Sequence, residues 1–267
     1  PDFEYAEADG AWLDFIHRRT DDAEIYFVAN RENRPASVDC FFRVADRTPE
    51  IWDPVTGQVS GAAGVRRDHG RTSLRMTFEP HQAFFVVFPK VTARPDVSVV
   101  ANSRELSVVR ELAGPWTVKF DPAWGGPAEI EFSRLSDWTQ HVDEGIRYYS
   151  GTATYVKRFD SPTVPAGPLF LDLGAVKNIA EVRLNGERLG VVWTAPWRIE
   201  ITDAVKPSGN QLEIVVANLW PNRLLRDAML PPEERLTRTN IEMDPKAALL
   251  PSGLLGPVTL RVEAASR

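Results

Sequence analysis

Aromatic and planar polar side chains gather between residues 193 and 227. Flat aromatic rings can pack on the apolar C–H faces of a sugar, while amide, carboxylate and guanidinium groups can bind its hydroxyls. Tryptophan in an all-β protein also fills cores and interfaces, so core packing and partner contact stay open beside sugar binding. Arg223 with Asp227 could equally be a buried ion pair that fixes a loop. The candidates are Trp193, Trp197, Trp220, Asn222, Arg223 and Asp227, with Trp138 and Tyr149 as further members.

An acidic cluster in residues 137–145 offers different chemistry. Calcium prefers several oxygen ligands from one loop, and Asp137, Asp143 and Glu144 would supply carboxylates. The spacing is not that of a dedicated calcium loop. We therefore expect no cofactor, with calcium as the weaker alternative.

Other site classes find little support. The histidines, His17, His69, His81 and His141, are scattered and none has ligand spacing to another or to a cysteine. Cys40 is the single cysteine, which excludes an intrachain disulfide, and its apolar strand pattern predicts a buried thiol. Nucleophile-elbow, phosphate-loop and dinucleotide motifs are missing from the sequence.

The charge and the hydropathy of the chain argue against two classes of partner, nucleic acid and membrane. The net charge of −6 argues against nucleic acid, which requires a basic face. No run approaches 18 apolar residues, so we expect no transmembrane helix and no membrane partner. The chain starts at Pro1 and is expected to be a piece of a longer protein.

Strands must position these residues, because alternating apolar segments recur along the whole chain. Residues 24–30 and 36–44 are expected to form a hairpin, and Asn185-Gly186 predicts a second one with a tight turn. Residues 147–159 and 249–262 read as long strands, and residues 135–142 as a short helical turn. The predicted fold is all-β: a small β-sandwich in residues 1–92, a linker at 91–96, and a jelly-roll β-sandwich in residues 97–267.

Several segments in this order resemble the C-terminal, galactose-binding-like β-sandwich region of family 106 glycoside hydrolases, the α-L-rhamnosidase-like proteins. Similarity to the sugar-binding jelly-roll of family 2 enzymes such as β-galactosidases is looser. The N-terminal half is similar to the small β-sandwich that precedes the jelly-roll in the same proteins. The segments are EIYFVANRENRPASVDCFFRV, PEIWDPVTGQ, YYSGTATYVKRF, LDLGAVKNIAEVRLNGERLGVVWTAPW, NQLEIVVANLWPNRLLRD and LLPSGLLGPVTL.

The resemblance implies a non-catalytic role. In the family, the acid and base carboxylates lie on a (β/α)₈ barrel that precedes this region, and no βαβ alternation appears here. No catalytic residue can be carried over, and we expect no carboxylate pair in one cleft. The implied partners are the barrel and carbohydrate, an exposed apolar patch should mark where the barrel docks, and the implied compartment is the periplasm or outside the cell.

Three other functions remain open. The chain could be an autonomous carbohydrate-binding module, which would need a solvent-open aromatic strip. It could be a domain of a family 2-like β-galactosidase. It could also be a hydrolase in its own right, which would need two carboxylates about 5–10 Å apart in one cleft.

Overall fold

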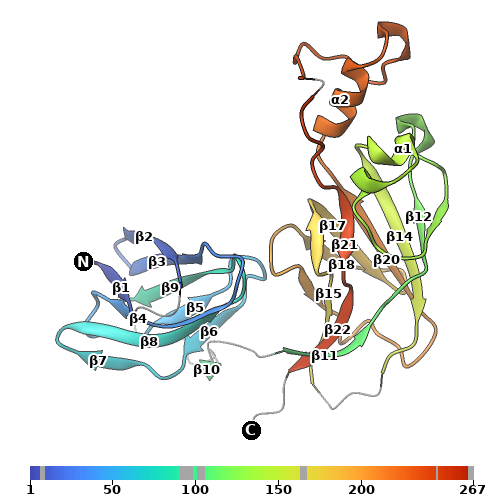
Figure 1. Cartoon of the computed structure of the whole chain (residues 1–267). Helices are drawn as coiled ribbons and strands as arrows, with labels where there is room; N and C mark the ends of the chain where they lie inside the picture. Colours follow the sequence, from blue (N-terminus) through green and yellow to red (C-terminus); the bar gives the residue numbers. More distant parts are fainter. Residues whose placement is uncertain (7–9, 91–98, 101–105, 163–166, 245, 264–267) are drawn as a thin grey trace. The chain divides into compact units, whose positions relative to one another are not determined.

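The computed structural model is all-β, as predicted, and separates into two compact units, Pro1–Glu105 and Leu106–Arg267 (Figure 1). It describes residues 1–6, 10–90, 99–100, 106–162, 167–244 and 246–263. The expected linker at residues 91–96 lies outside these ranges. Residues 99–100 pair with a strand of the first unit, whereas the sequence assigned them to the second. None of the helices in the described ranges has the length and hydropathy of a membrane span.

The first unit is a β-sandwich whose two sheets enclose one apolar core. Tyr26 and Phe88 of one sheet contact Phe42 of the other, with ring centroids 5.0 and 5.5 Å apart. One sheet has the order β1 (Phe3–Tyr5), β4 (Ala36–Phe42), β8 (Arg71–Phe78), β7 (Arg66–Asp68). The other has the order β10 (Val99–Val100), β6 (Val59–Ala62), β5 (Glu50–Trp52), β9 (Ala83–Pro89), β3 (Ala23–Asn30), β2 (Leu13–Arg19).

The predicted hairpin of residues 24–30 with 36–44 is wrong. β3 pairs with β2 and β9, whereas β4 pairs with β1 and β8 in the opposite sheet. The Asn30 side chain donates to the carbonyls of Arg34 (2.7 Å) and Glu79 (3.0 Å), which fixes the chain as it crosses between sheets. Alternation reveals that one face of each strand is buried, but not which strand lies beside it.

The second unit is a larger β-sandwich. Its four-stranded sheet has the order β11 (Leu106–Glu111), β22 (Thr259–Glu263), β15 (Leu169–Asp172), β19 (Arg198–Glu200). Its six-stranded sheet has the order β13 (Ile130–Phe132), β12 (Trp116–Lys119), β14 (Thr152–Phe159), β20 (Asn210–Ala217), β17 (Ile179–Leu184), β18 (Glu187–Val192). β16 (Ala175–Lys177) and β21 (Gly253–Gly256) form a separate pair.

The Asn185-Gly186 hairpin is confirmed as the connection between β17 and β18. The two turn residues have φ values of 55° and 86°, the left-handed region that Asn and Gly tolerate best. The Asn185 amide donates to the Ala204 carbonyl at 2.8 Å and to Asn210 Oδ1 at 2.9 Å. The turn is therefore tied to the neighbouring loop.

Two predicted strands of the second unit have different bounds in the structure, and helical segments lie between its strands. The expected turn in residues 135–142 is confirmed as the 3₁₀ helix η2 (Trp138–Gln140). The strand predicted at 147–159 begins only at Thr152, because α1 (Glu144–Arg147) precedes it. The strand predicted at 249–262 is two strands, β21 and β22, broken at Pro257, which has no N–H for a sheet. The helices η1 (Pro122–Trp124) and α2 (Pro221–Ala228) were not predicted. The short 3₁₀ helix η3 (Pro232–Glu234) begins in the Pro231-Pro232 pair, where a helix start was one of two interpretations of Glu233-Glu234.

Candidate functional site

Loops bearing three tryptophans meet at one end of the six-stranded sheet in the second unit. Ala217, the last residue of β20, pairs with the first residues of β14 and β17, and β18 ends opposite the start of β17. Because these strands are antiparallel, the segments after β12, β18 and β20 leave from the same end. Those segments carry Trp124, Trp193 and Trp220, and we call this region the tryptophan end. Figure 1 shows α1 and α2 at this end as well.

Two of the predicted tryptophans are open to solvent. Trp193 is 55% exposed and Trp220 is 47% exposed. Trp220 contacts Trp124 edge to face, with ring centroids 5.0 Å apart. Trp197 instead packs against the core of the unit, and its carbonyl accepts a hydrogen bond from Leu173 N at 2.7 Å. The exposed rings could contact either a sugar or a protein surface.

Trp138 and Tyr149 are core residues. Both are fully buried and their rings meet edge to face at 5.6 Å. Trp138 Nε1 donates to the Tyr155 hydroxyl at 2.6 Å, and the Tyr149 hydroxyl donates to the Thr152 carbonyl at 2.9 Å. Burial raises the pKa of the Tyr149 hydroxyl. Neither ring has a face left for a sugar or a partner, so core packing is the interpretation that applies to this pair.

Asn222, near the start of α2, is a structural clamp. Its Nδ2 donates to the Leu250 carbonyl at 2.8 Å and to Ser252 Oγ at 3.1 Å. Its Oδ1 accepts from Leu250 N at 2.8 Å, and the side chain is buried. The amide that could have bound sugar hydroxyls is thus used to fix the chain that returns to β21.

Arg223 and Asp227 form a buried ion pair on α2, which is one of the interpretations that the sequence left open. Arg223 Nη1 lies 3.9 Å from Asp227 Oδ1, and Arg223 Nη2 donates to the Trp124 carbonyl at 2.7 Å. Asp227 Oδ2 accepts from the backbone N and the hydroxyl of Thr237, at 2.7 and 2.5 Å. Burial lowers the pKa of Arg223, and the Asp227 charge opposes that shift.

This buried pair is incompletely satisfied. Arg223 Nε and Asp227 Oδ1 have no hydrogen-bond partner within the described ranges. The pair nevertheless connects the carbonyl beside the Trp124 ring, helix α2 and the loop at Thr237. It stabilises the tryptophan end and does not reach solvent.

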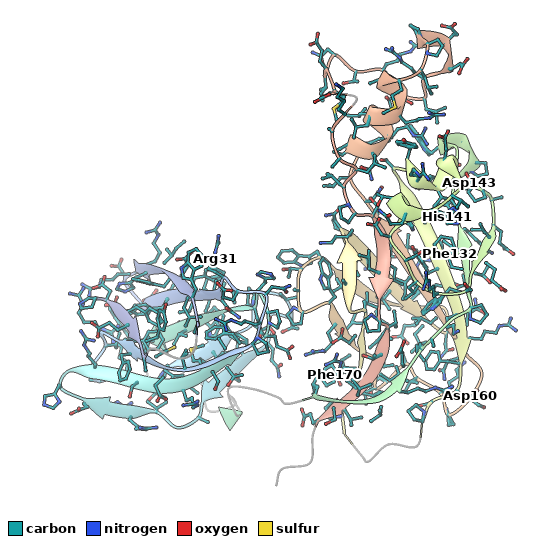
Figure 2. The ribbon with its side chains drawn as sticks, in the orientation of Figure 1. Arg31, Phe132, His141, Asp143, Asp160 and Phe170 are labelled. Carbon is teal, nitrogen blue, oxygen red and sulfur yellow. The ribbon has the colours of Figure 1, made fainter. Side chains whose placement is uncertain are left out.

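The carboxylates of the acidic cluster have separate structural partners. Asp137 accepts from two backbone N–H groups, at 2.9 and 3.0 Å, and Asp143 caps α1. Glu144 pairs with Arg226 at 2.7 Å. His141 stacks on a neighbouring phenylalanine and accepts from the backbone N of Asp143 (Figure 2). The part of the chain that the structure describes holds no group of three or more His, Cys, Asp or Glu residues that could bind a metal ion.

Three exposed apolar side chains share the outer face of the β17–β18 hairpin. Ala180 and Val192 are paired and point into the core, so Ile179, Val191 and Trp193 point to the other face. All three are exposed: Val191 lies on β18 at the edge of the sheet, Ile179 on the neighbouring strand β17, and Trp193 directly after β18. We call Ile179, Val191 and Trp193 the outer-face patch. An apolar patch of this kind was expected where a partner docks.

A shallow hollow of about 630 Å³ lies elsewhere on the six-stranded sheet. Two carboxylates, Glu129 and Glu131, are among the residues that line it. They are exposed neighbours on one side of an edge segment, and Glu129 is 3.5 Å from Lys119. Glycosidases instead place two carboxyl groups on either side of the scissile bond. The other lining residues are Pro115, Thr117, Val156, Lys157, Arg158 and Gln211.

Trp124 and α2 are the parts of this end that sequence reasoning missed. Pro221 was a usable signal for α2, because proline favours the first position of a helix. No local signal links Trp124 to Trp220, since the contact depends on the tertiary fold.

Comparison with known proteins gives three findings. A glycoside hydrolase family 106 model, described as alpha-L-rhamnosidase, matches residues 1–63. The structure of a rhamnosidase from Novosphingobium sp. PP1Y matches 98% of this chain at 38% identity, with a TM-score of 0.83. A putative beta-glucuronidase from Formosa agariphila is 39% identical over 178 residues, which is 57% of this chain.

This chain spans only part of each relative. It covers 25% of the rhamnosidase chain and 15% of the putative beta-glucuronidase. Both sandwiches lie within the rhamnosidase match, because that match includes nearly the whole chain. The chain therefore resembles, in sequence and in fold, the C-terminal β-sandwich region of family 106 glycoside hydrolases.

Proposed function

We propose that this chain is the non-catalytic C-terminal region of a longer glycoside hydrolase, the parent protein, which resembles α-L-rhamnosidase. The parent would hydrolyse glycosidic bonds in plant or microbial glycans. The region braces the catalytic barrel of the parent, and the galactose-binding-like jelly-roll of its second unit supplies the contact. Because such enzymes act on exported or imported glycans, the proposal includes a periplasmic or extracellular site of action.

The observation that carries this proposal is the coverage of the rhamnosidase. Nearly all of this chain superimposes on 25% of that protein, at a TM-score of 0.83. The greater part of the rhamnosidase therefore lies outside the match. A catalytic barrel would have to be supplied by that remainder, since both described units are β-sandwiches.

The outer-face patch supports the bracing role. Ile179, Val191 and Trp193 expose apolar surface on one sheet face. Removing such surface from water favours association by about 25 cal/mol per Å². The exposed pair Glu129 and Glu131 offers no comparable support for hydrolysis, because the two groups are neighbours on one strand segment and do not flank a bond.

One observation favours a second candidate, a carbohydrate-binding module. Trp193 and Trp220 expose their rings at the same end of the sheet, and exposed rings suit the apolar face of a sugar. The two candidates differ in what covers these rings: a protein surface in the first and a glycan in the second.

The test is a glycan-binding and hydrolysis assay on the chain alone. Titration with L-rhamnose, D-galactose and oligosaccharides, and incubation with an aryl α-L-rhamnoside, should show neither saturable binding nor turnover. Saturable binding that Trp193→Ala or Trp220→Ala abolishes in a folded protein would replace bracing by sugar binding. Trp12→Ala is the matched control, since Trp12 is also 55% exposed and lies in the first unit. Turnover would overturn the non-catalytic assignment.

A further inference from the structure

The connection between α2 and β21 leaves the sandwich as a long arm, residues 231–244. The arm contains one 3₁₀ turn, η3, and almost all of its side chains are exposed. Figure 1 shows it beyond α2, away from the strands of the unit. Connections of this length with little structure of their own are uncommon in compact domains and are usually functional when they are ordered.

Buried groups on α2 fix both sides of the arm. Asp227 accepts two hydrogen bonds from Thr237, and Asn222 binds both backbone polar groups of Leu250 on the return side. A local bond from Arg235 Nε to a backbone carbonyl, at 2.9 Å, tightens the first turn. The arm is thus held in place by buried side chains.

Most side chains in the tip of the arm, residues 238–244, are exposed to solvent. Ile241 is 58% exposed, and its backbone N donates to Thr239 Oγ1 at 3.0 Å, within the tip itself. Polar and charged residues surround Ile241 in sequence, among them Arg238 and Glu242. Ile241 and the half-buried Met243 are the apolar side chains of the tip, and apolar side chains within a polar rim are the pattern of a small protein contact. Anchoring the arm in advance reduces the entropy lost when such a contact forms.

We propose that this tip docks on the part of the parent protein that lies outside residues 1–267. The inference rests on the proposed function and names a second contact beside the outer-face patch. Its occupant is a protein surface of the same polypeptide, because this chain covers only 25% of the rhamnosidase that it matches. A glycan is the poorer occupant, since no residue from 221 to 267 is aromatic and the arm has no ring to stack on a sugar.

Cysteine labelling in the complete parent protein tests the tip. The native thiol of Cys40 is buried and burial raises its pKa to about 12, so it reacts slowly in the described unit. Ile241→Cys therefore introduces a distinct accessible thiol, read by mass spectrometry of the labelled peptide. Asn240→Cys provides a second thiol in case the first variant folds poorly. Val142→Cys, at a site 88% exposed on the same unit, is the control.

We expect maleimide labelling at the tip to slow at least about tenfold in the parent protein relative to residues 1–267 alone. The control thiol should change less than about twofold. Equal tip rates in the two proteins, with Val191→Cys protected in the parent, would overturn the arm contact and leave the bracing role standing. Equal labelling rates in the two proteins at both Ile241→Cys and Val191→Cys would overturn the arm contact and the bracing role. Protection that appears only when a glycan is added would replace the protein contact by a glycan contact.

Discussion

The two units share one architecture but differ in what some of their buried polar groups hold in place. In the first unit such groups secure the sandwich itself: buried Thr72 donates to the Val44 carbonyl at 2.6 Å, and Asn30 fixes a crossing between sheets. In the second unit, Asn222 and Asp227 are buried to hold surface segments at the tryptophan end. The difference indicates that the second unit maintains a defined surface. Burying the polar groups that hold this surface costs free energy, because they are removed from water.

The largest expected effect concerns the buried pair on α2. Asp227→Ala leaves Arg223 buried without its anionic partner, so we expect about 3–5 kcal/mol less stability of the second unit. Urea unfolding followed by tryptophan fluorescence measures this, because most of the eight tryptophans lie in that unit.

The ion pair between Glu144 on α1 and Arg226 on α2 is the control for this substitution. Glu144→Ala breaks a pair with Arg226 in which the Glu144 side chain is largely exposed, and about 0–1 kcal/mol is expected. Similar losses for the two variants would contradict the anchoring role of Asp227.

The next effect concerns the clamp at Asn222. Asn222→Ala leaves the backbone groups of Leu250 without their partner, at a cost of about 1–3 kcal/mol. Proteolytic cleavage within residues 231–244 should accelerate as well, because one side of the arm is released. Asn240→Ala, at an exposed position of the tip, should change neither the stability nor the rate of cleavage. An equal acceleration of cleavage in that variant would contradict the role of Asn222 as a clamp.

The stability of the first unit should depend on pH through a group of charged side chains around His17. His17 Nδ1 lies 3.1 Å from Asp2 and its Nε2 lies 2.8 Å from Glu24. The hydrogen bond from His17 lowers the pKa of Asp2; for Glu24, burial raises the pKa, but hydrogen bonds from His17 and Arg19 outweigh it. Lowered pKa values stabilise the fold above the ordinary 3.8 and 4.5 of these groups, and that stability is lost as the pH falls through the folded-state values.

His17→Gln should therefore reduce stability at pH 5 and weaken the loss on acidification, so that the two proteins converge in strong acid. Urea unfolding at pH values from 5 downward measures the effect. His69→Gln is the control, because His69 and its partner Asp68 are both exposed. A constant difference at every pH would mean that His17 acts only through packing on Tyr26.

The smallest stability effect is expected at the outer-face patch. Val191→Asp alters an exposed side chain and should change the free energy of unfolding by no more than about 0.5 kcal/mol. Val108→Asp, on the other sheet, is matched in residue type and exposure. A large loss in the first variant alone would mean that Val191 serves the fold and is not a free docking residue.

Local chemistry allowed part of this structure to be predicted from the sequence. Asn185-Gly186 identified its hairpin because its turn requires positive φ at both residues, and alternation identified most strands. The partners of β3 and β4 could not be predicted, since pairing depends on contacts distant in the sequence. For the site, residue type identified Trp193 and Trp220 as exposed candidates but could not separate them from Trp138, whose burial depends on the surrounding core.

The most direct test of the account is calorimetric titration of this chain against the separately expressed remainder of the parent protein. We expect saturable one-to-one binding with a negative heat-capacity change, because apolar surface is buried. Val191→Asp should weaken it and Val108→Asp should leave it unchanged. Two well-folded proteins that show no binding, or binding that both variants weaken equally, would contradict the proposed bracing role.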